Sequence, residues 1–242
     1  MSLIMTLYVR EGIVMASDSR LTLNTQQQSG ANQVTNLAVG QSDSNYKTFL
    51  TSTGVGISTY GAASIKGAPI GGYIESFIND IAIPNALAID QVPDELLKYF
   101  PALQPVPDTQ FHVAGYKKTQ KSSEQQVWHV SVAQGTKNQV NPSGAQGASC
   151  GGKADILSRL ISPVGLLDQQ GNVTSTPPVY EIPWGFFTLQ GAIDFATFAV
   201  RWTIEALRFQ TRAKTVGGPI DVLVIKATGA LWVQRKELRG TS

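Results

Sequence analysis

The stretch EGIVMASDSRLTL, residues 11–23, carries the clearest indication of fold in the chain. A glycine turn leads into an apolar run from Ile13 to Ser17, and the run ends on Asp18-Ser19-Arg20. A short apolar run after a glycine turn is typical of a buried strand. A buried strand with this ending predicts one of two things: a polar strand end with an internal ion pair, or a carboxylate held in a functional site.

Length and composition exclude several classes of protein. The 242 residues are enough for a sizeable core, and with no repeat or linker they predict a single domain over 1–242. The net charge of +2, without a basic cluster, gives no support for nucleic-acid binding. No apolar run reaches the roughly 18 residues of a membrane span. The single cysteine, Cys150, excludes an internal disulfide framework and predicts a reducing compartment, the cytoplasm.

Hydrophobic periodicity predicts strands and helices in the order strands, helices, strands, helices, strands. This order favours an α+β fold with two packed sheets and outer helices. The polar residues 24–45 predict an exposed loop insertion, residues 141–152 a Gly/Ser-rich loop, and residues 189–213 a helix buried between layers. The predicted strands are 3–9, 13–17, 46–52, 55–61, 109–116, 126–133, 219–227 and 230–236, and the other helices are 62–81, periodic only after residue 70, 93–100 and 153–161.

The residue inventory limits the possible chemistry. His112 and His129 each lie in the middle of a predicted strand and are expected to be structural. No HExxH, CxxC or carboxylate cluster occurs, so neither a metal nor a cofactor is expected. A hydroxyl nucleophile then needs another base, and an α-amino group with a pKa of about 7.7–8.0 can accept a proton at neutral pH. Ser2 becomes such a nucleophile once Met1 is removed, which its small side chain favours.

The segment GIVMASDSR resembles the GVVxAxDSR signature of the proteasome β-type N-terminal-nucleophile (Ntn) hydrolases, which include the bacterial HslV peptidase and the Anbu proteins. The family's nucleophile lies sixteen residues before the Asp, at Ser2. Its catalytic Lys falls on Lys47 in YKTF, and its oxyanion-hole Gly, fourteen residues later, falls on Gly61 in TYGAAS. Further along, FHVAGY, GGKADILSRLI and TVGGPIDVLVI are similar to family stretches, the last two to those of the Anbu type. The resemblance covers almost the whole chain and implies a four-layer αββα sandwich.

By this resemblance the chain is a peptidase subunit of the threonine/serine N-terminal-nucleophile type. It implies a peptide or unfolded-protein substrate, a homo-oligomeric ring or helical assembly, and an ATP-dependent unfoldase as partner. The implied substrate pocket is uncharged, so cleavage is expected after neutral or apolar residues. The implied catalytic residues are Ser2, Asp18, Lys47, Gly61 and Ser149, supported by Ser19 and Arg20, and the implied substrate-binding residues are Asn45, Phe49, Thr59 and Ala63.

Several departures from the family pattern keep alternatives open. Ala213 and Val216 stand where the family has a helper acid and a serine, and the 24–45 insertion is extra. Ser2 is therefore either the nucleophile or an ordinary residue behind a retained Met1. Asp18 with Lys47 is either part of a site or a structural ion pair. The alternative function is a catalytically inactive subunit with a role in assembly, and a small-molecule amidase on the same scaffold is a third possibility.

Overall fold

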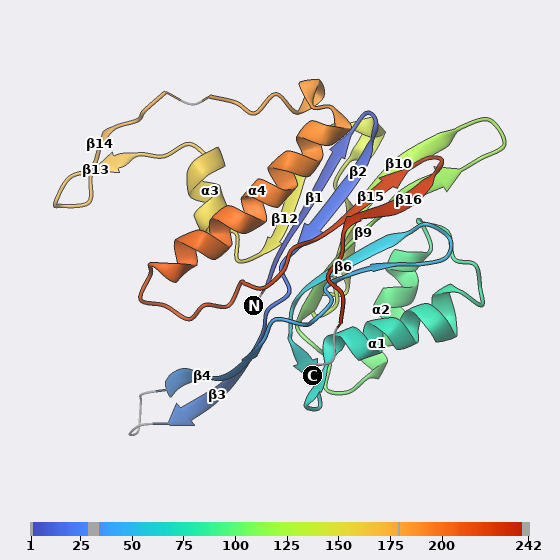
Figure 1. Cartoon of the computed structure of the whole chain (residues 1–242), viewed down its shortest axis with the longest axis horizontal. Coiled ribbons are helices and arrows are strands. Elements are labelled where there is room, and N and C mark those ends of the chain that lie inside the picture. Colours follow the sequence, from blue (N-terminus) through green and yellow to red (C-terminus); the bar gives the residue numbers. More distant parts are fainter. Residues whose placement is uncertain (1, 29–33, 179, 239–242) are drawn as a thin grey trace.

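The computed structural model describes residues 2–28, 34–178 and 180–238, and it is a mixed α+β fold (Figure 1). Two five-stranded sheets form its centre, and every paired strand in them is antiparallel. The first sheet has the order β12 (Gly147–Gly152), β1 (Leu3–Val9), β2 (Gly12–Ser17), β15 (Asp221–Lys226) and β16 (Gly229–Gln234). The second has the order β11 (Thr136–Gln139), β10 (Ser123–Ser131), β9 (Thr109–Lys118), β6 (Gly56–Gly61) and β5 (Thr48–Leu50).

Helices cover the outer side of each sheet. In Figure 1, α3 (Asp155–Ile161) and α4 (Leu189–Arg208) lie on one side of the first sheet, while α1 (Ile70–Phe77) and α2 (Val92–Ala102) lie beside the second. One buried cluster joins β1, β2 and β15 to α3 and α4, and another joins β6, β9 and β10 to α1 and α2. A third joins the two sheets.

The central strands are buried on both faces, yet their side chains still alternate between two clusters. In β2, Val14 and Ala16 pack against the helix side, whereas Ile13 and Met15 pack against the second sheet. In β15, Leu223 and Ile225 face that sheet as well. Both faces of β2 are apolar, which explains the continuous run seen in the sequence.

Most predicted elements are confirmed, including the hairpin of β1 and β2 and that of β15 and β16. The helix predicted over 62–81 begins only at Ile70, after a small hairpin of β7 (Ser64–Ile65) and β8 (Ala68–Pro69), and continues as a π-helical turn, Ile78–Ala82. Among the described residues, no helix is both long enough and apolar enough to span a membrane.

Three predictions are wrong in part. The 24–45 loop is mostly a hairpin of β3 (Leu21–Gln28) and β4 (Val34–Ser42), because the hydrogen bonds of a strand pair come from the backbone and do not require apolar side chains; residues 29–33 lie outside the described part. The 141–152 loop contains β12, which fills the free edge of β1. Helix α4 is not buried all round, since Phe198 and Trp202 are 48% and 44% exposed. A hydrophobic sequence pattern cannot reveal which apolar face lacks a cover.

Candidate active site

Asp18 is the most densely bonded side chain of the site. Asp18 is the first residue after β2, and it is fully buried. One carboxylate oxygen accepts from the Leu3 N–H at 2.9 Å and the Lys47 ammonium at 2.7 Å. The other accepts from the N–H groups of Arg20 at 3.1 Å and Gly217 at 3.0 Å. Four donors on one buried carboxylate tie Asp18 to both ends of the β1–β2 hairpin, to Lys47 and to Gly217.

Lys47 forms a buried ion pair with Asp18. Its side chain is 6% exposed, and its backbone carbonyl accepts from the N–H of Thr59 on β6 at 2.9 Å. Burial lowers the pKa of the Lys47 ammonium, and the attraction of Asp18 opposes this change. A lysine with a lowered pKa and one fixed counter-ion is typical of a functional site, although structural ion pairs also show it.

Ser2 lies at the start of β1 with its backbone held from two directions. Its carbonyl accepts from the Lys153 N–H at 2.7 Å, and the next N–H, that of Leu3, binds Asp18. Gly152 of β12, which pairs with Leu3, has a φ of +88°, and a Cβ there would lie 1.9 Å from the Ser2 carbonyl oxygen. Only glycine allows this close approach of the two strands. Met1, whose removal the hypothesis requires, lies outside the described residues.

A hollow in the surface joins Ser2 to Lys47. Its enclosed volume is about 20 Å³, room for about one water molecule. Of the residues expected in the substrate pocket, Asn45, Thr59 and Ala63 line it. The lining residues are Ser2, Arg20, Leu21, Thr22, Asn45, Tyr46, Lys47, Thr59, Tyr60, Ala62, Ala63, Pro69, Ile70 and Gly71.

Arg20 and Ser19 hold the chain around Asp18. The Arg20 guanidinium makes two 2.7 Å hydrogen bonds to Asp43, at the end of the β3–β4 hairpin. This contact raises the pKa of Arg20 and lowers that of Asp43. The Ser19 hydroxyl donates to the Pro219 carbonyl at 2.6 Å. Both side chains therefore fix the path of the backbone next to Asp18 rather than entering the buried ion pair.

Gly61 lies at the edge of the hollow, between the lining residues Tyr60 and Ala62. Its φ is +100°, and a Cβ there would come within 2.5 Å of the Asp108 carbonyl oxygen. The neighbouring Ala62 N–H donates to that same carbonyl at 2.7 Å. The local backbone thus requires glycine, and the turn it makes ends β6 at the hollow.

Ser149 is not brought to the hollow. It lies on β12 opposite Thr6, and its hydroxyl is 3.3 Å from Nε2 of His112, while the Thr6 hydroxyl is 2.9 Å from Nδ1 of the same ring. Burial lowers the pKa of His112 to about 3, so the ring is neutral at physiological pH. His112 is therefore a buried, hydrogen-bonded histidine, as expected, and Ser149 contacts it instead of Ser2.

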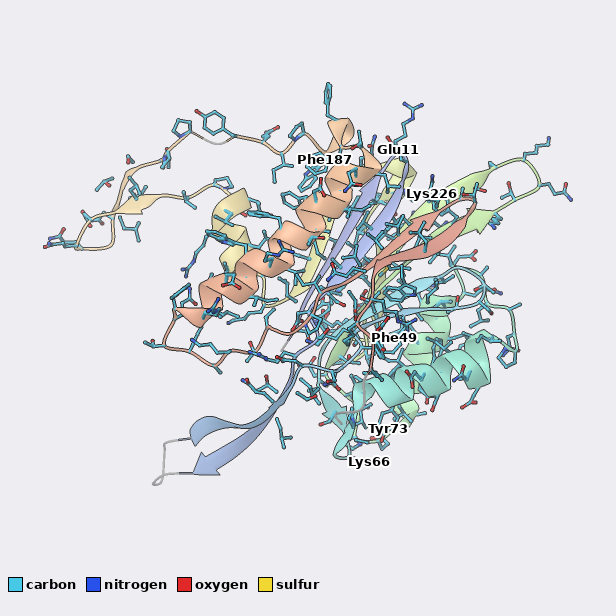
Figure 2. All side chains as sticks on the ribbon, viewed as in Figure 1. Glu11, Phe49, Lys66, Tyr73, Phe187 and Lys226 are labelled. Atoms are coloured by element: carbon cyan, nitrogen blue, oxygen red, sulfur yellow. The ribbon has the colours of Figure 1, made fainter. Side chains whose placement is uncertain are left out.

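Phe49 is not among the residues that line the hollow, although its ring lies next to one of them, Gly71. It is 5% exposed and belongs to the core cluster beside α1, where Figure 2 labels it. Conversely, eight of the residues that line the hollow had no role assigned from the sequence, and Thr22 and Tyr60 are two of them. Thr22 is 4% exposed, and its hydroxyl has no hydrogen-bond partner among the described residues. The Tyr60 hydroxyl lies 2.8 Å from both Gln110 and His129, and burial raises its pKa to about 12.

Metal chemistry finds no support in the described part of the chain, where no group of three or more His, Cys, Asp or Glu side chains lies within reach of one ion. The hollow instead offers a hydroxyl, a buried ammonium and backbone N–H groups. That set suits proton transfer and attack on a carbonyl. In comparisons with known proteins, no family model and no curated protein matches this chain.

Proposed function

We propose that the chain is a proteasome-like peptidase subunit of the Ntn-hydrolase type, with Ser2 as its N-terminal nucleophile. The observation that carries the proposal is the hollow that Ser2 and Lys47 line together, with Asp18 buried behind it in an ion pair with Lys47. The three buried clusters support a four-layer αββα sandwich for the fold. The single cysteine of the chain fits a cytoplasmic protein, and two of its sequence stretches resemble those of the bacterial Anbu proteins.

The proposed acylation needs only groups at the hollow. After Met1 is removed, the α-amino group of Ser2 takes the proton from its own Oγ, which attacks a peptide carbonyl. The Gly61 N–H stabilises the oxyanion that forms. The new ammonium then gives its proton to the leaving amine as the C–N bond breaks, leaving an ester on Ser2.

The remaining groups set charge and position. The positive charge of Lys47 lowers the pKa of the Ser2 amine and stabilises the developing oxyanion, while Asp18 holds Lys47 in place. In deacylation the same amine deprotonates a water, which attacks the ester and frees the acid and Ser2. The uncharged side chains of Asn45, Thr59 and Ala63 favour a neutral or apolar residue before the scissile bond.

The test begins with protein expressed from its own start codon, with Met1 loss measured by intact mass. A panel of short peptide coumarylamides, neutral or apolar before the scissile bond, then reports hydrolysis. Ser2→Ala should abolish it, and Ser2→Thr should retain it because the hydroxyl remains. Ser52→Ala is the matched control, since Ser52 is exposed and outside the hollow. Met1-free protein that is folded but inactive on the panel would contradict the proposal.

One observation favours the inactive-subunit alternative: an enclosed volume of about 20 Å³ is too small for a substrate side chain. The same intact-mass measurement separates the two functions. Complete retention of Met1 blocks the amine and supports an assembly role without catalysis.

A further inference from the structure

A second buried ion pair lies beside the hollow, and the proposed mechanism does not use it. Asp221, the first residue of β15, is fully buried, and the side chain of its partner Lys236 is 5% exposed. Asp221 lies opposite Ser17, the residue before Asp18, so the two buried carboxylates are on neighbouring strands. A buried ion pair adds little net stability, because removing two charges from water is costly. A second one at this position therefore favours a role in the site.

Lys236 is held at two points by Asp221 and itself holds Tyr46 at two points. One Asp221 oxygen accepts from the Lys236 N–H at 2.8 Å, and the other accepts from the Lys236 ammonium. The same ammonium lies 4.1 Å from the centroid of the Tyr46 ring, and the Lys236 carbonyl accepts from the Tyr46 hydroxyl at 3.2 Å. A cation over an aromatic face is attracted to it. These contacts connect a central strand of the first sheet to Tyr46, which lines the hollow.

The segment that carries Lys47 has little regular structure of its own. Residues 43–47, between β4 and β5, form neither a helix nor a strand, so contacts from other segments must fix them. The Asn45 N–H and the Lys47 carbonyl each make one backbone hydrogen bond outside the segment. Tyr46, between them, is held through its side chain by Lys236. The position of Lys47 in the hollow therefore depends on Lys236.

The charge of Lys236 also acts on Lys47. Burial lowers the pKa of the Lys47 ammonium most, Asp18 and Asp43 oppose this change, and the positive charge of Lys236 lowers the pKa further. The two buried ion pairs are thus coupled electrostatically. The other titratable groups that line the hollow are Arg20, Tyr46, Tyr60 and, once Met1 is removed, the α-amino group of Ser2.

We propose that Lys236, fixed by Asp221, is a positioning residue of the site, which holds Tyr46 at the hollow and thereby keeps Lys47 in place against Asp18. This inference rests on the proposed function, because it names what positions Lys47 for that reaction. Lys236 acts through Tyr46 and Lys47 and does not contact the substrate. Its loss should therefore lower kcat and change the titration of Lys47, with little change in KM.

A double variant tests this role on the full chain. Asp221→Asn/Lys236→Met removes both charges at once, so neither partner is left buried and unpaired. The matched control is Asp94→Asn/Lys137→Met. Lys137 likewise pairs with an aspartate, at 2.6 Å, and lies over an aromatic ring, that of Trp128, at 5.5 Å, but neither partner lines the hollow.

A milder variant covers the case in which the double variant does not fold. Tyr46→Phe removes only the hydroxyl that is bonded to the Lys236 carbonyl and keeps the ring under the ammonium. A melting temperature within a few degrees of wild type verifies folding for each variant.

The first readout needs no catalysis. NMR of protein with lysine ¹³C-labelled at Cε follows each ammonium as the pH rises, and Lys47→Met identifies the Lys47 signal. In the double variant, Lys47 should titrate at a pH at least about 0.5 unit higher than in the wild type, because a neighbouring positive charge is gone and the side chain is less tightly enclosed. Tyr46→Phe should shift the titration in the same direction by less, and the control should leave it unchanged.

The second readout is peptide hydrolysis by Met1-free protein. In the double variant kcat should fall on the order of 10–100-fold, with KM changed by less than about threefold, because a displaced Lys47 weakens transition-state stabilisation rather than substrate binding. If the wild type hydrolyses no peptide while the Lys47 titration shifts as expected, the proposed function fails and the positioning of Lys47 by Lys236 stands. A Lys47 titration unchanged in the folded variants overturns the proposal. So does a wild-type kcat in the double variant, or an equal change in the control.

Discussion

Replacing Lys47 with Met separates a catalytic role of this lysine from a structural one. The change removes the ammonium but keeps most of the side-chain volume in a site that is only 6% exposed. Asp18 loses one of its four donors and keeps the N–H groups of Leu3, Arg20 and Gly217. Its negative charge therefore remains hydrogen-bonded on both oxygens.

The magnitude follows from two opposing contributions. Loss of a hydrogen bond between charged groups costs about 1.5–3 kcal/mol. The variant also no longer buries an ammonium whose pKa burial already lowers, which offsets part of that cost. We expect a net loss of about 0–2 kcal/mol in the free energy of unfolding, or at most about 4–8 °C in melting temperature for a chain of this size.

Hydrolysis and unfolding are measured on the same preparation. Urea denaturation gives the stability, and the peptide panel gives kcat/KM, which should fall on the order of 10²–10³-fold because an electrostatic contact to the oxyanion is lost. Asp18→Asn is the contrasting variant, because it leaves Lys47 buried without its counter-ion and should cost about 3–5 kcal/mol. If Lys47→Met instead costs 3–5 kcal/mol while folded protein keeps its activity, Lys47 is structural and the reasoning is refuted.

Three further predictions concern the hollow and the buried histidine. Gly61→Ala should lower the free energy of unfolding by about 2–4 kcal/mol, because Gly61 has a positive φ and a Cβ there would lie 2.5 Å from the Asp108 carbonyl oxygen. In thermal denaturation the control Gly72→Ala should be neutral or slightly stabilising, because the Cβ position of Gly72 in α1 faces open space. Equal losses of stability in the two variants would contradict this. His112, with its pKa lowered to about 3, stays neutral in the fold while the unfolded chain takes up a proton as the pH falls below about 6.5. In urea titrations, the free energy of unfolding of the wild type should therefore decrease toward pH 5, and that of His112→Gln should decrease less. The two slopes should differ by up to about 1.4 kcal/mol per pH unit, and parallel curves would refute the assignment of His112 as a buried neutral histidine. Ala63→Glu places an acid in the wall of the hollow. The kcat/KM preference for substrates with Lys or Arg before the scissile bond should therefore rise about tenfold. An unchanged preference would show that Ala63 does not contact the substrate.

Much of the central sheet is predictable because its pattern is local. The glycine turn at Gly12 and the apolar runs beside it predict β1 and β2. The spacing of the motifs that resemble the family predicts that Asp18 and Lys47 meet in one site, and the structure has an ion pair between these two residues. The hydrogen bonds that Asp18 accepts from Leu3 and Gly217 depend on strand ends far apart in sequence, which no local pattern reveals.

Strand β12 was missed because GASCGG, residues 147–152, has no hydrophobic alternation. It is a strand because its backbone pairs with the edge of β1, and its glycines leave room for a neighbour: a Cβ on Gly151 would lie 2.3 Å from the Tyr60 ring. The family resemblance predicts Ser149 as a catalytic residue, whereas pairing with Thr6 directs its hydroxyl toward His112. Helical periodicity likewise identified Phe198 and Trp202 as apolar but could not show that their face is uncovered.

The most direct test of Ser2 as an N-terminal nucleophile is covalent labelling of Met1-free protein with a peptide epoxyketone. This group closes a stable ring with a hydroxyl and an α-amine of the same residue, so it reports both at once. Intact mass followed by peptide mapping should show one adduct, on Ser2, that Ser2→Ala removes and Lys47→Met strongly reduces. A folded, Met1-free protein that acquires no adduct, or acquires it on Cys150, would contradict the assignment of Ser2 as the nucleophile.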